Sequence, residues 1–192
     1  IGLVIAFKDF RLSEGILGSP WCGFDNFSRL FMSAQFLNAL RNTVMISVLR
    51  LAFGFIAPIT LALLLNELRI TWFKRVIQTV TYIPHFISWV ILGGICLMLF
   101  SANGPVNAML KASDLATVDF LTNDYWFIAT LIVTGIWQSV GYGAVIYLAA
   151  LAGIPPTLYE AAHTDGANRW QQTLHITLPC LAPTIIVLFI LS

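Results

Sequence analysis

The sequence predicts an all-α integral membrane protein built as a multi-span helical bundle. Hydrophobic residues make up 58% of the 192 residues and charged residues only 10%, and the mean hydropathy is +0.85. A soluble domain carries about 25% charged residues, so this chain has too few to cover its surface in water. The apolar runs must be helical because lipid offers no partners to backbone N–H and C=O groups.

Three complete spans are predicted, at about residues 43–65, 76–100 and 126–151. Even the shortest would rise about 34 Å as a helix, enough to cross a hydrocarbon core of about 30 Å. A fourth apolar run opens near residue 180 and is incomplete at residue 192, and residues 1–7 are interpreted as the end of an earlier span. We therefore expect one transmembrane domain over residues 1–192, truncated at both ends.

Shorter features are expected between and within these spans. Helical spacing of apolar residues over 27–40, after a cap at Asp25 or Asn26, predicts a short helix on the membrane surface. Pro84-His85 predicts a kink in the second span, with His85 hydrogen-bonded to a neighbouring helix. Arg50 lies about 10 Å below the external end of the first span. A central arginine costs about 2.5–3.5 kcal/mol, so we expect it to snorkel or to pair with a carboxylate.

The loops differ in charge, which bears on orientation. The loop at 66–75 carries Arg69, Lys74 and Arg75, whereas the loop at 101–125 carries one lysine and three aspartates. The positive-inside rule therefore places the first loop in the cytoplasm and the second outside. Four basic residues in the stretch 8–42 weaken this assignment, because that stretch would be external.

Composition and spacing also exclude several functions. A net charge of +1, without clustered lysines and arginines, argues against nucleic-acid binding. Three widely spaced cysteines form neither a disulfide framework nor a CxxC site, and we expect no bound metal. His163, Asp165 and His175 raise the alternative of an integral membrane enzyme, but their spacing suits neither metal ligation nor acid–base work. No lysine follows glycine as a P-loop requires, so we expect no ATPase site and no bound cofactor.

A polar loop over 153–179 separates the third and fourth spans. A helix is expected to begin near Pro156 or Thr157, because proline suits the first helical turn. Glu160 would lie in or near that turn, where a carboxylate favours the helix dipole. Gly166 can adopt a left-handed conformation and turn the chain between two helical pieces. Such a helix, held between two turns, would move as a rigid body.

This loop resembles the EAA loop of ABC importer permeases, in which E-A-A, three residues, G, nine residues and I-x-L-P follow in order. The matching residues are Glu160, Ala161, Ala162, Gly166, Ile176, Leu178 and Pro179, and Asp165 and Ala167 fit the sugar-importing branch. The resemblance implies a MetI-like permease core with a cytoplasmic coupling helix, on which a separate ATPase docks.

Other stretches resemble the maltose-type carbohydrate permeases. Those stretches are Trp21, Gly23, Asn26 and Phe27 (W-x-G-x-x-N-F), Asn42-Thr43, Gly104 with Asn107 and Leu110 (G-x-x-N-x-x-L), and Tyr159 before the E-A-A. Residues 82–88 (YIPHFIS) are similar to the subgroup that imports oligosaccharides derived from polysaccharides. The resemblance implies a multi-pass protein of the bacterial cytoplasmic (inner) membrane.

The resemblance also implies partners and a mechanism. Two permease subunits would pair, a dimer of ATPase subunits would use ATP and Mg²⁺, and an extracellular solute-binding (lipo)protein would deliver sugar. ATP can drive a conformational change of this assembly only by binding one of its global states better than the other. An ABC permease for a non-sugar solute remains the alternative.

Candidate residues for the substrate path lie in the third span, because sugars bind through aromatic stacking and polar groups. Trp137, Gln138 and Tyr142 are the candidates, and Gln138 and Tyr142 share a helix face. A glutamine there must find a partner or line a wet cavity. The competing interpretation is helix packing, which Gly135, Gly141 and Gly143 favour because small residues let helices approach.

Overall fold

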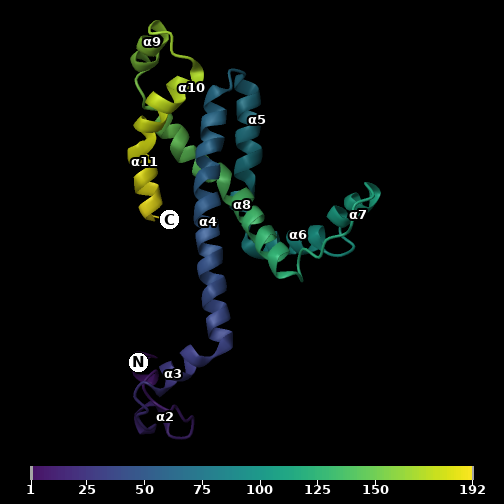
Figure 1. Ribbon diagram of the computed structural model, residues 1–192, viewed down its shortest axis with the longest axis vertical. Helices are drawn as coiled ribbons and strands as arrows, with labels where there is room; N and C mark the ends of the chain where they lie inside the picture. Colours follow the sequence, from purple (N-terminus) through teal and green to yellow (C-terminus); the bar gives the residue numbers. More distant parts are fainter. Residues whose placement is uncertain (1, 192) are drawn as a thin grey trace. The chain divides into compact units, whose positions relative to one another are not determined.

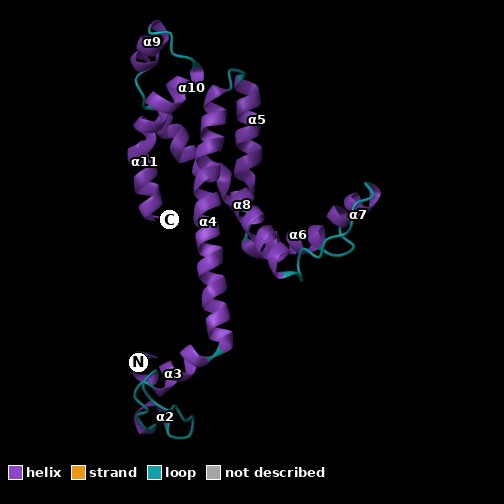
Figure 2. Ribbon diagram, viewed as in Figure 1, coloured by secondary structure: helices purple, strands orange, loops and turns teal. Residues whose placement is uncertain are grey.

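The computed structural model describes residues 2–191, and these residues are almost entirely helical (Figures 1 and 2). Within this range the only strand-like pairing is an isolated bridge between Lys8 and Trp21. The elements in order are α1 Gly2–Ile5, α2 Gly15–Gly18, α3 Asp25–Met32, α4 Ala34–Glu67, α5 Thr71–Tyr82, the 3₁₀ helix η1 Ile83–Phe86, α6 Trp89–Phe100, α7 Pro105–Ala112, α8 Asp124–Ala152, α9 Pro156–Thr164, α10 Arg169–Gln172, the π-helix η2 Thr173–Thr177, and α11 Leu178–Leu191.

The chain divides by its internal contacts into two compact units, Ile1–Ser47 and Val48–Ser192, and the boundary falls within α4. Four helical segments among the described residues are long and apolar enough to cross a membrane. They are Ala34–Glu67, Trp89–Ala112, Asp124–Ala152 and Arg169–Leu191. Helix α8 covers the third predicted span, beginning two residues earlier and ending one residue later, and α11 covers the fourth except for residue 192, which lies outside the described residues.

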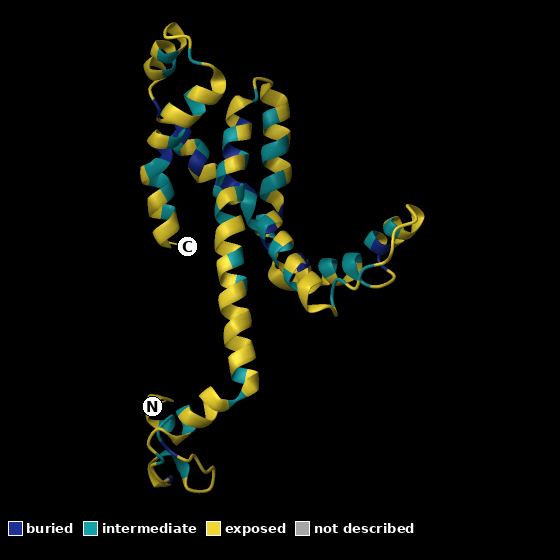
Figure 3. Ribbon diagram, viewed as in Figure 1, coloured by how far each residue is buried: buried dark blue, intermediate teal, exposed yellow. Residues whose placement is uncertain are grey.

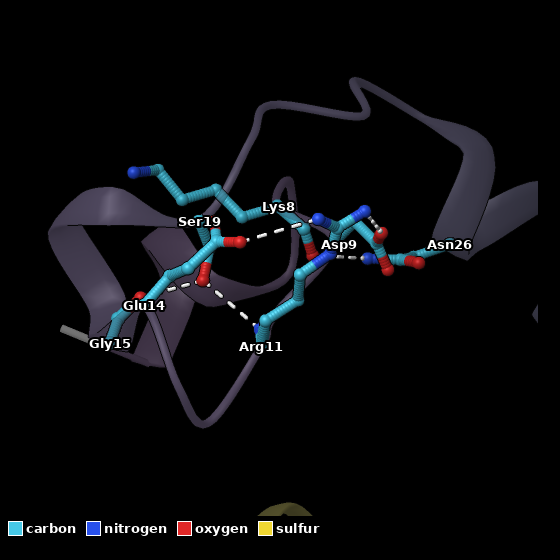
Figure 4. A network of polar contacts seen from close by, with 7 residues as sticks. All are labelled: Lys8, Asp9, Arg11, Glu14, Gly15, Ser19 and Asn26. Carbon is cyan, nitrogen blue, oxygen red and sulfur yellow. Dashed lines mark hydrogen bonds and ion pairs between the residues drawn. The ribbon is translucent and has the colours of Figure 1, made fainter.

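The first unit is held together by polar contacts, of which Figure 4 shows the bond from Asn26 to the Lys8 carbonyl and the contacts among Asp9, Arg11, Glu14, Gly15 and Ser19. The Lys8 side chain is buried, and its Nζ donates to the carbonyl oxygens of Ile16 and Leu17 at 2.9 and 3.1 Å. The same ammonium lies 5.0 Å from the ring centroid of Trp21. Nδ2 of Asn26 donates to the carbonyls of Ala6 and Lys8. A buried ammonium needs such partners because an unpaired charge is costly away from water.

This network gives a physical reason for the W-x-G-x-x-N-F pattern. Trp21 covers the Lys8 ammonium, Gly23 adopts a φ of +59°, and Asn26 closes the loop by its side chain. The ring of Phe27 lies 5.2 Å from that of Phe7. Each of the four residues of the pattern therefore has a structural role in this unit.

The predicted surface helix over 27–40 is wrong in its extent and its cap. Extended backbone at Ser33 ends α3 at Met32, and the residues from Ala34 onward begin α4. The N-cap is Phe24, without a side-chain hydrogen bond, because Asn26 uses its amide to hold the loop instead. The first span is consequently longer than the predicted 43–65.

The second predicted span, 76–100, is not one continuous helix. After α5 the chain tightens into η1, leaves helical geometry at Ile87 and Ser88, and restarts as α6 with Ser88 as its N-cap. Proline at position 84 removes a backbone donor and breaks the α-helical ladder there. The kink predicted at Pro84-His85 is thus confirmed, while the membrane-spanning candidate by length and hydropathy begins at Trp89.

The core of the second unit lies where α4, α8 and α11 meet (Figure 3). Its buried residues are Ala62, Ala144, Tyr147, Leu151, Ile154 and Leu181. Two of the three predicted packing glycines are confirmed: a Cβ on Gly143 would lie 3.0 Å from the ring of Pro58, and one on Gly141 would collide with the backbone of Thr81. Small residues thus bring helices α4 and α5 close to α8, the arrangement that drives helix association in lipid.

The segment after α6 is fastened by Asn107, which is fully buried in α7. Its Nδ2 donates to the carbonyls of Ser101 and Val118, and its Oδ1 accepts from the Val118 N–H at 2.9 Å. One side chain thereby satisfies three backbone groups of the loop, which explains the asparagine in the G-x-x-N-x-x-L pattern.

Candidate functional site

The loop between α8 and α11 begins with α9, which starts at Pro156 as expected. The helix ends in a hydrogen-bonded C-terminal motif in which the Gly166 N–H donates to the carbonyl of His163 and the Ala167 N–H to that of Ala162. Gly166 has a φ of +79°, confirming the predicted left-handed turn. This pairing is the Schellman motif, which ends a helix with its last carbonyls satisfied.

A second set of hydrogen bonds starts the next helix directly after that turn. The Asn168 side chain accepts from the Gln171 N–H at 2.9 Å, and the Gln171 side chain accepts from the Asn168 N–H at 2.8 Å. This reciprocal pair is a capping box, which satisfies two otherwise free donors at a helix start. The orientation of α9 relative to α10 is therefore set by only three residues, Asp165 to Ala167.

Two side-chain contacts fasten the loop to the rest of the second unit. The hydroxyls of Tyr159 in α9 and Thr177 in η2 are hydrogen-bonded at 2.9 Å, and Thr177 is buried. Arg169 Nη1 in α10 donates to Glu67 Oε2 at the end of α4, also at 2.9 Å. The Arg169–Glu67 pair was not predicted from the sequence, because the two residues are 102 positions apart.

The predicted coupling residues lie largely on the surface of this loop. Glu160, Ala161, Asp165, Gly166 and Pro179 are exposed, whereas Ala162, Ala167, Ile176 and Leu178 are partly buried. Glu160 is the fifth residue of α9, just past the first turn, which agrees with its predicted position in or near that turn. Its side chain therefore gains little from the amino-terminal helix dipole, whose effect falls off within one turn.

An open cleft of about 940 Å³ lies between α9, α10 and the end of α4. Glu160 and His163 line it from α9, Arg169 from α10, and Glu67 and Arg69 from the α4 end. On the other side of the turn, a smaller hollow of about 330 Å³ is lined by Ala162, Gly166 and Ile176 among others. The predicted coupling residues thus border two concave surfaces: the larger carries several charged side chains, and the smaller combines small and apolar residues with Asp165, Gln171, Gln172 and His175.

The substrate-path candidates are only partly brought together. Gln138 is buried, and its Nε2 donates to the backbone carbonyl of His85 at 3.5 Å. The ring of Tyr142 stacks on that of His85 with centroids 4.1 Å apart and planes 3° from parallel. Trp137 precedes Tyr142 by five residues, about 140° around the helix, and is 46% exposed.

His85 therefore belongs with Gln138 and Tyr142, although the sequence predicted for it only a hydrogen bond to a neighbouring helix. Its predicted hydrogen bond to a neighbouring helix is made by its backbone carbonyl, whereas its ring is held by stacking. Within residues 2–191, Nδ1 of His85 is the buried side-chain nitrogen or oxygen that lacks a hydrogen-bond partner. An unsatisfied buried group costs about 1–3 kcal/mol, so this ring position favours a hydrogen-bond partner, which a water molecule could supply.

Comparison with known proteins decides the family. The family model described as "Binding-protein-dependent transport system inner membrane component" matches residues 54–192. The chain belongs to this family. With four membrane-spanning candidates among residues 2–191, this inner membrane component is a multi-pass membrane protein.

Two curated proteins align with all or nearly all of the residues of this chain. The polygalacturonan/rhamnogalacturonan transport system permease protein YteP of Bacillus subtilis (strain 168) is 46% identical over 192 residues, or 100% of this chain and 60% of that protein. Protein LplB of the same strain is 44% identical over 99% of this chain and 60% of LplB. The chain thus spans about 60% of the length of these curated relatives.

Solved structures agree with this assignment. The crystal structure of a bacterial ABC transporter involved in the import of the acidic polysaccharide alginate matches with a TM-score of 0.89 and 45% identity, covering 99% of this chain and 63% of the matched chain. A second structure, of the bacterial alginate ABC transporter in complex with an alginate pentasaccharide-bound periplasmic protein, matches with a TM-score of 0.85 and 46% identity over 88% of this chain and 59% of the other.

The Arg169–Glu67 pair of this inner membrane component yields a prediction about stability. Both side chains are about half exposed, so breaking the pair by Arg169→Ala should lower the free energy of unfolding by less than about 1 kcal/mol. Thermal unfolding of the purified protein in detergent, with Glu67→Ala and the double variant completing a cycle, measures this. A coupling energy well above 1 kcal/mol would show that the pair is shielded from water, contrary to the geometry.

Proposed function

We propose that this chain is the membrane-spanning permease subunit of a binding-protein-dependent ABC importer for an oligosaccharide. The observation that carries the proposal is the 46% identity, over the full chain, to a permease protein of a polygalacturonan/rhamnogalacturonan transport system. The structural similarity to an alginate importer points in the same direction. The alternative of a non-sugar solute has no such observation in its favour.

The loop at 153–179, here called the coupling loop, is the proposed docking site for a separate ATPase dimer. The interface residues are Glu160, Ala161, Ala162, Asp165, Gly166, Ala167, Ile176, Leu178 and Pro179. The exposed surface of α9 and the two concave surfaces beside it support this role, since a docking partner needs an accessible rigid element. ATP and Mg²⁺ would be used by that partner, because none of the lysines in this chain stands in a P-loop pattern.

The proposed substrate path runs along α8 at the break in the second span. Gln138 and Tyr142 are its first candidates, now joined by His85, and Trp137 offers a further exposed ring for stacking. Non-helical backbone at membrane depth is tolerated where it is buried in protein or lines a water-filled cavity. The interrupted backbone at residues 87–88, beside Tyr142 and Gln138, supports a polar cavity at this level.

A second permease subunit and an extracellular solute-binding protein would complete the importer. The complex of the alginate transporter with its periplasmic protein supports such an arrangement for this chain. On this view the loop at 66–75 and the coupling loop face the cytoplasm, and the stretches at 8–42 and 101–125 face outward.

The test is reconstitution of the full-length permease with its partner subunits in liposomes. We expect uptake of oligosaccharides to require ATP, the ATPase subunits and the solute-binding protein, and the ATPase to co-purify with the permease. Amino acids, oligopeptides and metal ions serve as control solutes. Uptake of one of these, with no uptake of any oligosaccharide, would reject the sugar assignment while keeping the importer class.

A further inference from the structure

Arg50 is a charged residue near the middle of the longest helix of the protein. It follows the first residue of α4 by 16 positions and precedes the last by 17, and it lies about 10 Å inside the apolar run that begins near residue 43. Its side chain is exposed in this chain. The Arg50 side chain has no hydrogen bond and no ion pair within residues 2–191.

The chain has no carboxylate at the depth of Arg50 that could neutralise it. In the four membrane-spanning candidates the only acidic residues are Glu67, the last residue of the first segment, and Asp124, the first residue of the third. Glu67 is about 25 Å from Arg50 along the helix and is engaged by Arg169. A second copy of this chain would add another Arg50 and no carboxylate at that depth. The counter-charge must therefore come from outside residues 2–191.

The side of α4 that carries Arg50 leaves space next to its side chain, because a Cβ at Gly54 would meet no atom within 4 Å. Gly54 and Ala57 lie four and seven residues farther along, on the same face, and both are partly buried. Pro58, which packs against Gly143 of α8, lies about 80° around the helix from Arg50. Arg50 is therefore at the flank of the side that α8 covers farther along the helix, where small residues leave room beside it.

We propose that Arg50 lies in the translocation path and binds a carboxylate of the transported solute, so that the cargo is an acidic oligosaccharide. The inference rests on the proposed function and adds the charge class of its substrate. An intramembrane ionisable residue without a partner in its own chain marks a substrate path more readily than a packing site. A guanidinium also suits the role, because it holds a carboxylate by two parallel hydrogen bonds and keeps its charge at depth.

Two other sources of negative charge make different predictions. A lipid phosphate reached by snorkelling would make Arg50 indifferent to the cargo, so that variants import all solutes normally. A carboxylate in the rest of the full-length permease or on the partner permease would make Arg50 a structural residue, so that its removal weakens folding or assembly and lowers import of every solute alike. The proposed role alone predicts a loss that depends on the charge of the solute.

The experiment uses the full-length permease assembled with its partners in liposomes, as Arg50→Gln and Arg50→Lys variants beside the unmodified protein. The probes are uronate trimers (galacturonate, glucuronate, mannuronate and guluronate) and the matching neutral hexose trimers, in which each carboxylate is a hydroxymethyl group. We expect Arg50→Gln to raise the transport KM for an acidic trimer about tenfold or more. Import of neutral trimers should stay unchanged, and Arg50→Lys should recover part of the acidic import. If the solute-binding protein delivers only acidic trimers, recovery in Arg50→Lys serves as the control for folding.

Three results would overturn the inference: equal loss for acidic and neutral trimers, normal import of acidic trimers by Arg50→Gln, or import by the unmodified transporter of neutral trimers alone. In each of these the oligosaccharide importer itself still stands. Failure of the unmodified transporter to import any trimer, acidic or neutral, would instead reject the proposed function.

Discussion

Replacing Gly141 with alanine is expected to push α5 away from α8 and to destabilise the second unit. A Cβ at this position would lie within 3.0 Å of the carbonyl group of Thr81 and of a ring carbon of Tyr82. The Thr81 atoms belong to the backbone of α5, so they cannot move aside as a flexible side chain would. Overpacking of this kind costs about 1–3 kcal/mol, and more where the backbone must shift.

The measurement is thermal unfolding of the purified protein in detergent, with glycines of the same helix as controls. Gly135→Ala adds a methyl group whose nearest neighbour is a Trp89 ring atom at 4.0 Å, which is ordinary contact. Gly143→Ala, with the Pro58 ring 3.0 Å away, should fall between the two. Equal melting temperatures for Gly141→Ala and Gly135→Ala would show that α5 and α8 do not approach as closely as described.

The same contact bears on the candidate substrate path. η1 follows α5 directly, so the approach of α5 to α8 at Gly141 also positions His85 over Tyr142. A shift of α5 should therefore lengthen both the ring stack and the hydrogen bond from Gln138 to the His85 carbonyl. The glycines that favour a packing interpretation and the polar residues that favour a path are parts of one arrangement rather than alternatives.

The membrane spans were predictable where hydropathy and helix ends coincide. In α8 the asparagine cap at Asn123 and the end at Gly153 bracket the apolar run, and the predicted span nearly matches the helix. In α4 they do not coincide, because Asn38, Arg41 and Asn42 are compatible with helix but not with lipid, so the helix extends beyond the apolar run. In the second span the apolar run is uninterrupted although the helix is broken, because hydropathy carries no information about backbone geometry.

The candidate site shows the same division between local and long-range information. The turn at Gly166 and the start of α9 at Pro156 depend on neighbouring residues, and both were predictable. The Arg169–Glu67 pair and the stack of His85 on Tyr142 join residues far apart in sequence. Spacing rules within one helix linked Tyr142 to Gln138 but offered no way to attach His85 to them.

Replacing Gly166 with valine is expected to uncouple ATP hydrolysis from import in the assembled transporter. A side chain at a φ of +79° is strained, by roughly 1–2 kcal/mol for an ordinary residue and more for a β-branched one. The turn would relax toward negative φ and re-aim α9, while α10 keeps its own capping box. Because a Cβ at Gly166 meets no atom within 4 Å, the effect comes from backbone conformation and not from a clash.

The matched control is Gly166→Asn, because asparagine tolerates the left-handed conformation. In liposomes containing the partner subunits, Gly166→Val should lower import at least tenfold while ATP hydrolysis continues and the protein remains folded in the membrane. Gly166→Asn should retain most of the import, and Glu160→Ala should resemble the valine variant if Glu160 contacts the ATPase. Equal import by the valine and asparagine variants would mean that the angle between α9 and α10 does not carry the movement, and the coupling role of this loop would have to be abandoned.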